Sequence, residues 1–322
     1  MNKFSKNIGI IGQGFVGTAV REKFKHHFNV YTFDIVKGEE SRIYAKEEIS
    51  ESQCDLNEVI KNCEIVFLCV PTPMFPSGKC DTGIVENAIS DIDKIAKKLE
   101  KHPILIIKST VPPGTTELLN KEYENVGVNF SPEFLTEANS VNDFKNQTRI
   151  VLGIDWIEYV EPIVNIFEAC FPDANIVVMN TAEAEMSKYM INLFLSTKVS
   201  FFNDMYKLID RINHTPIIDR QMKFETIVSS VLLDPRIGKS HYMVPGPDGD
   251  YGYGGHCFPK DMSAILSIAD ELKLPVPTLL GAHTTNTLVR KNKDWENMKG
   301  RAVSENEEWH VINYSSALED GI

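Results

Sequence analysis

A glycine-rich turn near the N-terminus constrains the fold most. An apolar, strand-like run at residues 8–11 leads directly into Gly-Gln-Gly-Phe-Val-Gly at residues 12–17, which opens a helical stretch. In this setting Gly12 permits the tight turn, Gly14 lets a pyrophosphate approach the backbone, and Gly17 lets helix and strand pack closely. Free amides and the positive end of the helix dipole then face the phosphates. The turn therefore predicts dinucleotide contacts at Gly12, Gly14, Phe15, Val16 and Gly17.

A carboxylate stands at the end of the second strand-like run. Asp34 follows the turn by about 20 residues, where an acidic side chain binds the ribose hydroxyls of NAD and repels the additional phosphate of NADP. Lys37 stands close by, so these residues alone do not fully decide between the two cofactors. Asp34 favours NAD, and we expect NAD as the cofactor.

Strand-like and helix-like segments alternate through the first 180 residues, a pattern typical of a parallel sheet wound with helices. The segments expected to form strands are 7–12, 29–34, 64–70, 103–110, 149–154 and 175–180, and the expected helices are 17–26, 84–101 and 157–171. The pattern predicts an α/β fold. Its first part, residues 1–180, is expected to be a doubly wound parallel Rossmann-type sheet that binds NAD.

The hydrophobic period changes at Thr181, which is placed to cap a helix. Apolar residues then recur at spacings of three and four, which indicates one long amphipathic helix; they include Met186, Met190, Leu193, Phe194, Phe201, Met205 and Leu208. Further helices are expected at 222–233, 261–272 and 279–291. We therefore predict a smaller all-helical domain over 181–299 and a frayed polar tail over 300–322.

The composition excludes several classes of protein. The chain of 322 residues is 43% hydrophobic and 24% charged, and it has no apolar run long enough to span a membrane. Its 33 basic and 45 acidic side chains give a formal charge of −12, which disfavours binding to nucleic acid. The N-terminus lacks a secretory signal, so a cytoplasmic protein is expected. Its 6 cysteines form no CxxC pair, and no metal site is predicted.

One cysteine lies in an unusual setting. Cys257 follows Gly254 and Gly255, which would let the backbone crowd against a substrate, and it precedes Phe-Pro-Lys-Asp at 258–261. Proline is favoured at the first helical position, which would put Cys257 or its neighbour beside a helix N-terminus. A thiol there, next to a lysine, has a lowered pKa, and the thiolate is the nucleophile. A typical cysteine is a small buried apolar residue, but this setting favours chemistry at Cys257.

Two sets of polar residues, each spaced three or four apart, are further candidates for chemistry. Glu185, Lys188 and Asn192 are spaced three and four apart, so they share one face of the long helix. A solvated helix face explains that spacing equally well. Glu133 and Glu137 lie four apart beyond an apolar strand, at the edge of a parallel sheet where ligands bind. Either set is a candidate to supply the general base.

Two threonines follow the third and fourth predicted strands. Thr72 lies in Cys-Val-Pro-Thr-Pro at 69–73, and Thr110 lies in Lys-Ser-Thr-Val-Pro-Pro-Gly at 108–114. Both positions map to the same edge of the sheet as Glu133 and Glu137. Read alone, each segment is a turn.

Taken in this order, the motifs resemble those of the UDP-glucose 6-dehydrogenase family. They are GxGxVG, VPTP, STVPPGTT, SPEFLTEA, AEMSKYMINLFLSTKVSFFND, DPRIG and GYGGHCFPKD, and the resemblance runs from about residue 7 to residue 290. It implies a four-electron oxidation in which the primary alcohol of a nucleotide sugar becomes a carboxylate and two NAD molecules are used in turn. Cys257 matches the nucleophile, which forms a thiohemiacetal and then a thioester.

The resemblance also implies roles for other positions. Lys188 matches a lysine that stabilises the developing alkoxide, with Asn192 beside it, and Asp261 matches a carboxylate that supports proton transfer. Glu137 and Thr110 match residues that handle the water and the cofactor. Further implied cofactor contacts are Thr72 and Lys260, and implied substrate contacts are Glu133, Phe134, Leu135, Lys188, Asn192, Arg236, Tyr242 and Gly254. Arg236 matches an arginine offered to the substrate of a neighbouring subunit. Together with the long apolar helix, this match implies a homodimer in which residues 181–299 serve dimerisation and substrate binding.

The chain departs from the family pattern in three places. Family members continue into a third, nucleotide-binding domain, and this chain ends near the point where that domain would begin. The loop between Arg236 and Cys257 has an additional Pro-Gly-Pro-Asp-Gly at 245–249, and His256 replaces a serine or tyrosine. A histidine beside the nucleophile either tunes the thiolate or is a tolerated neighbour.

The sequence is compatible with several functions. The segments SPEFL and DPRIG favour UDP-glucose as the substrate, with GDP-mannose and UDP-N-acetylmannosamine as alternatives. A second class is a domain-truncated NAD-binding protein that needs a partner chain. A third is a two-electron hydroxyacid dehydrogenase, which needs a lysine and the cofactor domain but no thiol.

Overall fold

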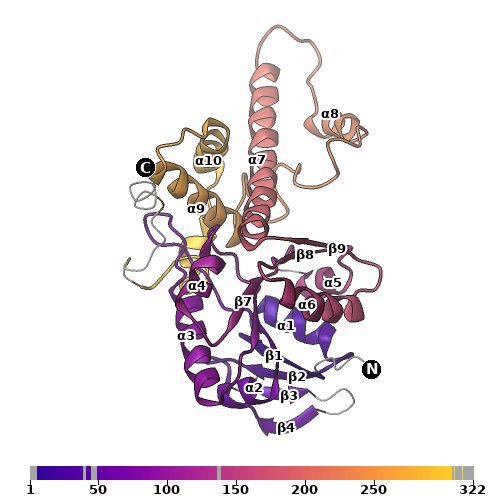
Figure 1. Ribbon diagram of the computed structural model, residues 1–322. Helices are drawn as coiled ribbons and strands as arrows, with labels where there is room; N and C mark the ends of the chain where they lie inside the picture. The colour runs from indigo at the N-terminus through magenta and orange to yellow at the C-terminus, as the bar shows by residue number, and fades with distance from the viewer. Residues whose placement is uncertain are drawn as a thin grey trace. The chain divides into compact units, whose positions relative to one another are not determined.

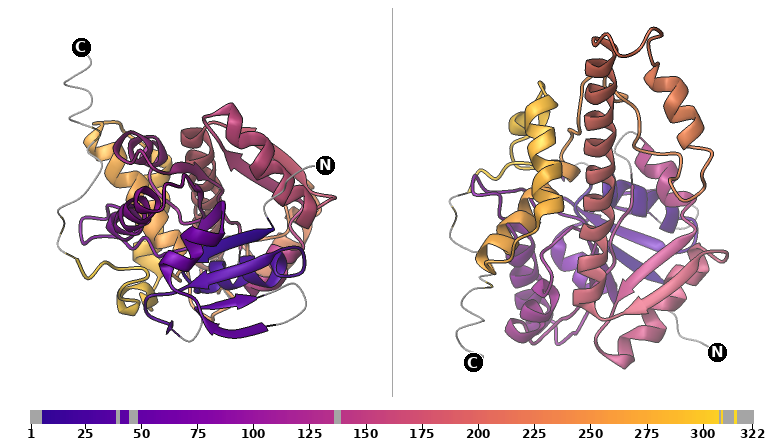
Figure 2. Two further views of the ribbon diagram at one scale, coloured as in Figure 1. Left: turned by 60° about the horizontal axis from the view of Figure 1, so that its bottom comes forward. Right: turned by 90° about the horizontal axis from the view of Figure 1, so that it is seen from above.

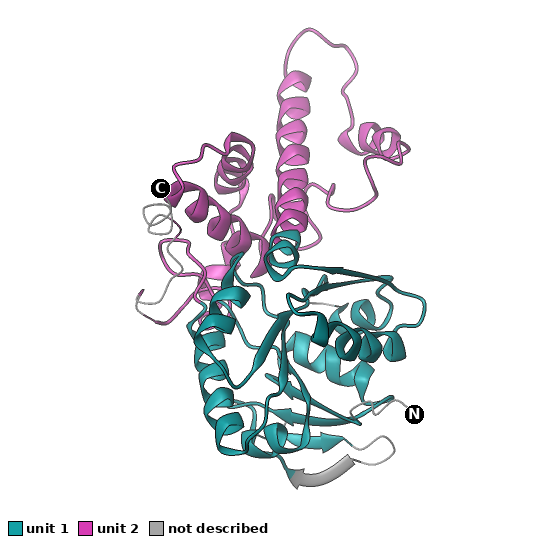
Figure 3. Cartoon of the chain, viewed as in Figure 1, with its two compact units in different colours: residues 1–72, 82–188 teal, residues 73–81, 189–322 magenta. Residues whose placement is uncertain are grey.

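The computed structural model describes residues 6–38, 41–44, 49–135, 139–306, 308 and 314 (Figure 1). The chain divides into two compact units, which are described separately (Figure 3). Unit 1 comprises residues 1–72 and 82–188, and unit 2 comprises residues 73–81 and 189–322. This division differs from the expected boundary at residue 180, because it falls within the long helix and assigns the short segment 73–81 to unit 2.

Unit 1 is built on a nine-stranded, mostly parallel sheet. Its strands are β1 (Asn7–Ile11), β2 (Asn29–Phe33), β3 (Arg42–Tyr44), β4 (Ile49–Gln53), β5 (Ile65–Leu68), β6 (Ile104–Ile107), β7 (Gly127–Phe130), β8 (Arg149–Gly153) and β9 (Asn175–Met179), in the order β4-β3-β2-β1-β5-β6-β7-β8-β9. Strands β2, β1, β5, β6 and β7 are parallel. Strand β1 has β2 on one side and β5 on the other, so the order of the strands reverses at β1, which confirms the predicted doubly wound α/β fold. The antiparallel strands β3 and β4 were not predicted.

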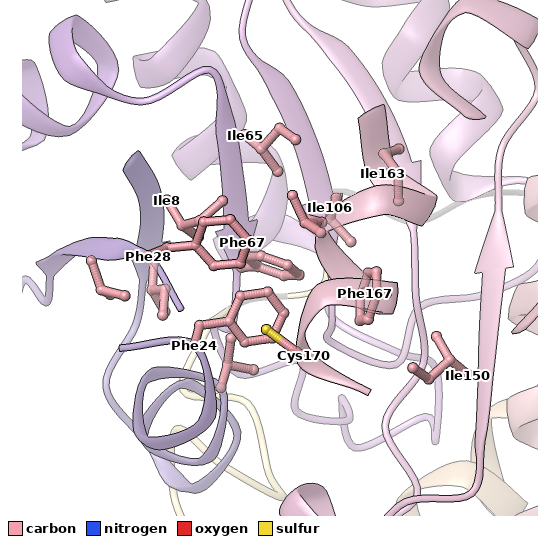
Figure 4. Packing of buried hydrophobic residues seen from close by; sticks show 14 of the residues in the cluster. Ile8, Phe24, Phe28, Ile65, Phe67, Ile106, Ile150, Ile163, Phe167 and Cys170 are labelled. Atoms are coloured by element: carbon pink, nitrogen blue, oxygen red, sulfur yellow. The ribbon is translucent and has the colours of Figure 1, made fainter. Parts of the chain in front are cut away.

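Helices cover both faces of this sheet (Figure 2). They are α1 (Phe15–Phe24), α2 (Leu56–Asn62), α3 (Gly83–Lys98), α4 (Thr115–Glu122), α5 (Ser140–Lys145) and α6 (Ile157–Cys170). One apolar cluster packs α1, α5 and α6 on one face, where Phe24 meets Phe67 edge to face at 5.0 Å between ring centroids (Figure 4). The other cluster packs α2, α3 and α4 on the opposite face. Alternate strand residues supply the two clusters because side chains of a strand alternate between faces.

Unit 2 is helical, as predicted. Helix α7 (Thr181–Asn213) begins in unit 1 and continues into unit 2, where α8 (Phe224–Val231), α9 (Cys257–Glu271), α10 (Pro277–Val289) and a 3₁₀ turn (Asp294–Asn297) follow. Among the described residues we find no helix with the combined length and hydrophobicity of a membrane span.

The start of α7 is capped one residue earlier than expected. Asn180 Oδ1 accepts a hydrogen bond from Glu183 N at 2.8 Å, and Glu183 Oε2 accepts one from Asn180 N at 3.0 Å. This reciprocal pair is a capping box. The expected cap, Thr181, instead donates its amide and hydroxyl to Asp155. Asp155 thereby ties the start of α7 to the end of β8.

Residues 300–306 are packed, which differs from the frayed tail expected there. Met74 N donates to Ala302 O, and Ser304 N donates to Met74 O, each at 2.8 Å. Asp81 accepts hydrogen bonds from Ser304 and Asn306. These contacts explain why 73–81 belongs to unit 2. Beyond residue 306, only 308 and 314 of the predicted tail lie within the described residues.

Candidate active site

The glycine turn has the shape that a bound dinucleotide requires. Gly12 has φ +87°, and a Cβ atom there would lie 2.5 Å from Cys69 O. At Gly17 a Cβ atom would lie 1.8 Å from Gly12 O. At Gly12 and Gly17 the packing of the protein's own backbone therefore requires glycine. A Cβ atom at Gly14, the N-cap of α1, would meet nothing within 4 Å, so the open space there fits the close approach of a pyrophosphate.

Asp34 is positioned against this turn. Its Oδ2 accepts a hydrogen bond from Gln13 N at 2.6 Å, and Oδ1 accepts bonds from Val36 N and Lys37 N. Partial burial opposes ionisation, but these backbone hydrogen bonds outweigh it and lower the pKa of Asp34. Lys37 Nζ donates to Gln13 O at 3.1 Å. An ionised carboxylate beside the turn fits the ribose of NAD. The ammonium of Lys37 is already hydrogen-bonded to the backbone of the turn.

Thr72 and Thr110 meet at the carboxyl edge of the sheet, as predicted from their positions after β5 and β6. The Thr72 hydroxyl, which is buried, donates to Thr110 O at 2.7 Å. The structure therefore brings these two residues together within unit 1. Their contacts with the cofactor stay predictions.

Lys188 and Glu133 form the central ion pair of unit 1. Lys188 Nζ lies 3.1 Å from Glu133 Oε1 and 2.6 Å from Glu133 O. The second carboxylate oxygen accepts a bond from Leu135 N at 2.6 Å, and the Phe134 ring lies 5.5 Å from the ammonium. The expected substrate residues 133–135 are thus grouped around one buried lysine. Glu137 lies outside the described residues.

The polar face of α7 is not solvated. Glu185, Lys188 and Asn192 are all buried. The Glu185 carboxylate accepts bonds from Gly114 N at 2.6 Å, from Thr116 N at 2.9 Å and from the Thr116 hydroxyl at 2.6 Å. Burial raises the pKa of Glu185 to about 7, although these hydrogen bonds oppose the shift. Because its oxygens cap α4, Glu185 anchors that helix to α7.

Cys257 is the first residue of α9 and is half-buried, whereas the other five cysteines are buried. His256 is the N-cap, and Pro259 stands at the third helical position rather than the first. The helix therefore begins two residues earlier than the proline rule predicts. This difference places the thiol at the helix N-terminus itself, where the helix dipole favours negative charge.

A buried polar group follows Cys257 in the first turn of α9. Lys260 Nζ donates to Asp261 Oδ1 at 2.7 Å, and Asn192 Nδ2 donates to Asp261 Oδ2 at 2.6 Å. Burial alone would lower the pKa of Lys260, but Asp261 and the thiols of Cys80 and Cys257 raise it overall. Lys260 is therefore a cation that interacts electrostatically with Cys257, and Asp261 holds Lys260 and Asn192 together.

The remaining predicted residues of unit 2 have different surroundings. A Cβ atom at Gly254 would lie 2.1 Å from Arg290 Nη2, so packing against Arg290 already requires a glycine. Tyr242 stacks edge to face on Phe202 at 6.3 Å. Arg236 is exposed and pairs with Asp234 at 2.5 Å. None of these contacts tests the expected binding of substrate.

One further buried lysine lies at the carboxyl edge of the sheet. Lys108 directly follows β6 and is only 2% exposed. The signal was available, because a lysine at the carboxyl end of an apolar parallel strand lies at the ligand-binding edge. The local pattern of its segment, residues 108–114, is that of a turn and does not by itself distinguish Lys108.

Comparison with known proteins agrees with this geometry. The NAD binding domain of the UDP-glucose/GDP-mannose dehydrogenase family matches residues 6–170, and the central domain of the same family matches residues 182–288. A UDP-glucose 6-dehydrogenase from Rickettsia bellii is 33% identical over 243 residues, covering 74% of this chain and 51% of the relative. An uncharacterized protein from Methanocaldococcus jannaschii is 34% identical over 286 residues, covering 79% of this chain and 30% of that protein.

Solved structures show the same fold. A UDP-glucose dehydrogenase from Pyrobaculum islandicum superposes with a TM-score of 0.74 at 26% identity, covering 89% of this chain and 70% of that chain. The chain spans about half or less of the length of the curated relatives described above.

Proposed function

Because this chain belongs to the UDP-glucose/GDP-mannose dehydrogenase family, we propose that it oxidises the primary alcohol of a nucleotide sugar to a carboxylate with NAD. UDP-glucose is the favoured substrate. The observation that carries the proposal is Cys257, which is the half-buried thiol at the N-terminus of α9 beside a buried cation. A two-electron hydroxyacid dehydrogenase has no use for a thiol in that position.

The proposed reaction assigns a role to Lys188 and a role to Cys257. Bound NAD supplies the hydride acceptor for each of the two oxidations. Lys188 stabilises the oxyanion of the alcohol as it loses its proton. The Cys257 thiolate adds to the resulting aldehyde to form a thiohemiacetal, whose oxidation leaves a thioester. Water then hydrolyses the thioester, which releases the carboxylate and restores the thiol.

The substrate is tested by NADH formation from the purified protein. We expect turnover with UDP-glucose and two NADH per sugar consumed, since the alcohol and the aldehyde level are each oxidised once. GDP-mannose and UDP-N-acetylmannosamine are the comparison substrates. One NADH per sugar would contradict the four-electron reaction. No NADH from any of the three sugars would contradict the proposed enzyme.

We also propose that the protein is a homodimer through α7. The apolar stripe of α7 is largely exposed: Met190 is 64% exposed, Phe194 69%, Phe201 56% and Leu208 51%. The helix packs on its own unit through Tyr189, Phe202 and Ile209, and through Leu193, which is a buried member of the stripe. An apolar stripe of this kind marks a protein interface, and a second copy of the same helix offers a self-complementary partner.

The dimer is tested by placing charge on the stripe. The double variant Phe194→Asp, Phe201→Asp should be monomeric, because each carboxylate would be buried without a partner in the dimer. Leu288→Asp, at a comparably exposed leucine of α10, is the matched control and should stay dimeric. Sedimentation velocity measures the mass, and circular dichroism checks the fold. A wild-type monomer, or a dimeric double variant, would disprove this interface.

A further inference from the structure

Lys108 is a buried lysine that the proposed chemistry does not use. Its ammonium donates to the Ser131 hydroxyl and to Pro132 O, each at 3.1 Å. Both acceptors lie just after β7, in the turn that carries Glu133. Lys108 itself follows β6, the neighbouring strand, so its side chain bridges the carboxyl ends of two adjacent strands.

Burial of the Lys108 ammonium in this place costs free energy of folding, so we looked to function for the reason that a lysine stands here. Neither direct acceptor carries a charge, and a buried ammonium without a directly bonded carboxylate is costly. The rings of Phe144 and Phe167 lie 5.7 and 6.0 Å from Nζ and offset part of the cost. An apolar side chain of similar size would fill the same space at a lower cost. A role in stability alone therefore does not explain a lysine here.

The contacts of the turn connect Lys108 to Lys188. Lys108 binds Pro132 O, and the next residue, Glu133, offers both its main-chain oxygen and its carboxylate to Lys188. One ammonium thus holds the turn before Glu133, and the other is held by Glu133 itself. Residues 131–133 therefore link the two lysines: Ser131 and Pro132 bond to Lys108, and Glu133 bonds to Lys188.

We propose that Lys108 is a positioning residue, which fixes the turn at Ser131 and Pro132 so that Glu133 holds the ammonium of Lys188 in its reactive place. The inference rests on the proposed function for the role of Lys188. It predicts a loss in the chemical step with little change in cofactor binding, because Lys108 acts on the turn and not on the glycine loop.

The charge of Lys108 should appear in the pH profile. Burial lowers the pKa of Lys108 to about 8; the neighbouring Cys69 and Glu133 oppose this shift, and Lys188 adds to it. The native lysine therefore loses its proton as the pH rises through about 8. We expect kcat of the wild type to fall as the pH rises through about 8, as the turn loses one charged donor. Lys108→Arg stays charged and should lack this fall.

The test compares Lys108→Met and Lys108→Arg with the wild-type chain. We expect Lys108→Met to lower kcat for UDP-glucose by about 100-fold, the loss that a misplacement of about 1 Å produces, while the Kd for NAD is unchanged. Lys108→Arg should keep most of the turnover. Lys101→Met, at an exposed lysine, is the matched control. A wild-type kcat in Lys108→Met, or equal losses of kcat and NAD binding, would overturn the proposal.

A second measurement does not depend on activity. The amide of Leu135 is bonded to the Glu133 carboxylate, so its hydrogen exchange reports whether the turn is held. It should exchange faster in Lys108→Met than in the wild type, and unchanged exchange would overturn the inference even if the wild-type protein oxidised no sugar. Should Lys108→Met fail to fold, Ser131→Ala, which removes one of the two acceptors, should show a smaller change in the same sense.

Discussion

Replacement of Cys257 by serine should lower the formation of the carboxylate from UDP-glucose, and with it the second NADH, by about 1,000-fold or more, as loss of a catalytic nucleophile does in other enzymes. Folding and NAD binding should be kept, because Cys257 is half-buried at the start of α9 and serine is nearly the same size. The reason for the loss is chemical. A serine hydroxyl has a far higher pKa than a thiol, so the helix N-terminus and Lys260 cannot make it a comparable nucleophile.

Cys80→Ala is the matched control for this experiment. Cys80 belongs to the same unit and also interacts with Lys260, but it is buried. Turnover should therefore survive its replacement, apart from a modest loss of stability. Undiminished activity in Cys257→Ser would rule out the covalent route, and a protein-bound acyl species in the wild type, measured by mass spectrometry, would support it.

Strong local patterns predicted most of the fold. The parallel strands are continuous apolar runs because both of their faces are covered by helices. Strands β3 and β4 escaped prediction because their sequences, Arg-Ile-Tyr and Ile-Ser-Glu-Ser-Gln, lack such a run, and β3 is only 3 residues long. The segment 73–81 joins unit 2 through backbone bonds between Met74 and residues 302–304, and no local pattern encodes a contact so distant in sequence.

The site was predictable where the chemistry needs a fixed spacing. The glycine turn and Asp34 follow from one strand–turn–helix unit, and the structure places them side by side. Burial was not predictable in the same way. Glu185, Lys188 and Asn192 fit a solvated face equally well, since spacing along a helix does not reveal which partners cover it. Their partners, Thr116, Glu133 and Asp261, come from distant segments.

Lys188→Met is the second prediction with a large expected effect, and it tests the ion pair with Glu133. We expect kcat to fall by about 100- to 1,000-fold, the loss produced when one stabilising donor is removed from a developing oxyanion. Methionine has nearly the length of lysine, so the packing against Phe134 should be kept. The variant should also be less stable by about 3 kcal/mol, because Glu133 would be left in a largely buried place without its cation.

Glu133→Gln in the Lys188→Met background separates the two effects. The neutral amide no longer needs a cation, so the double variant should recover most of the lost stability in thermal or urea unfolding. Turnover should stay low, because no ammonium is present to stabilise the alkoxide. If the double variant recovered turnover together with stability, the lysine would serve folding alone. If Lys188→Met kept the wild-type kcat, the oxyanion role would be wrong, and the buried pair would serve only to hold α7 against the turn at 131–135.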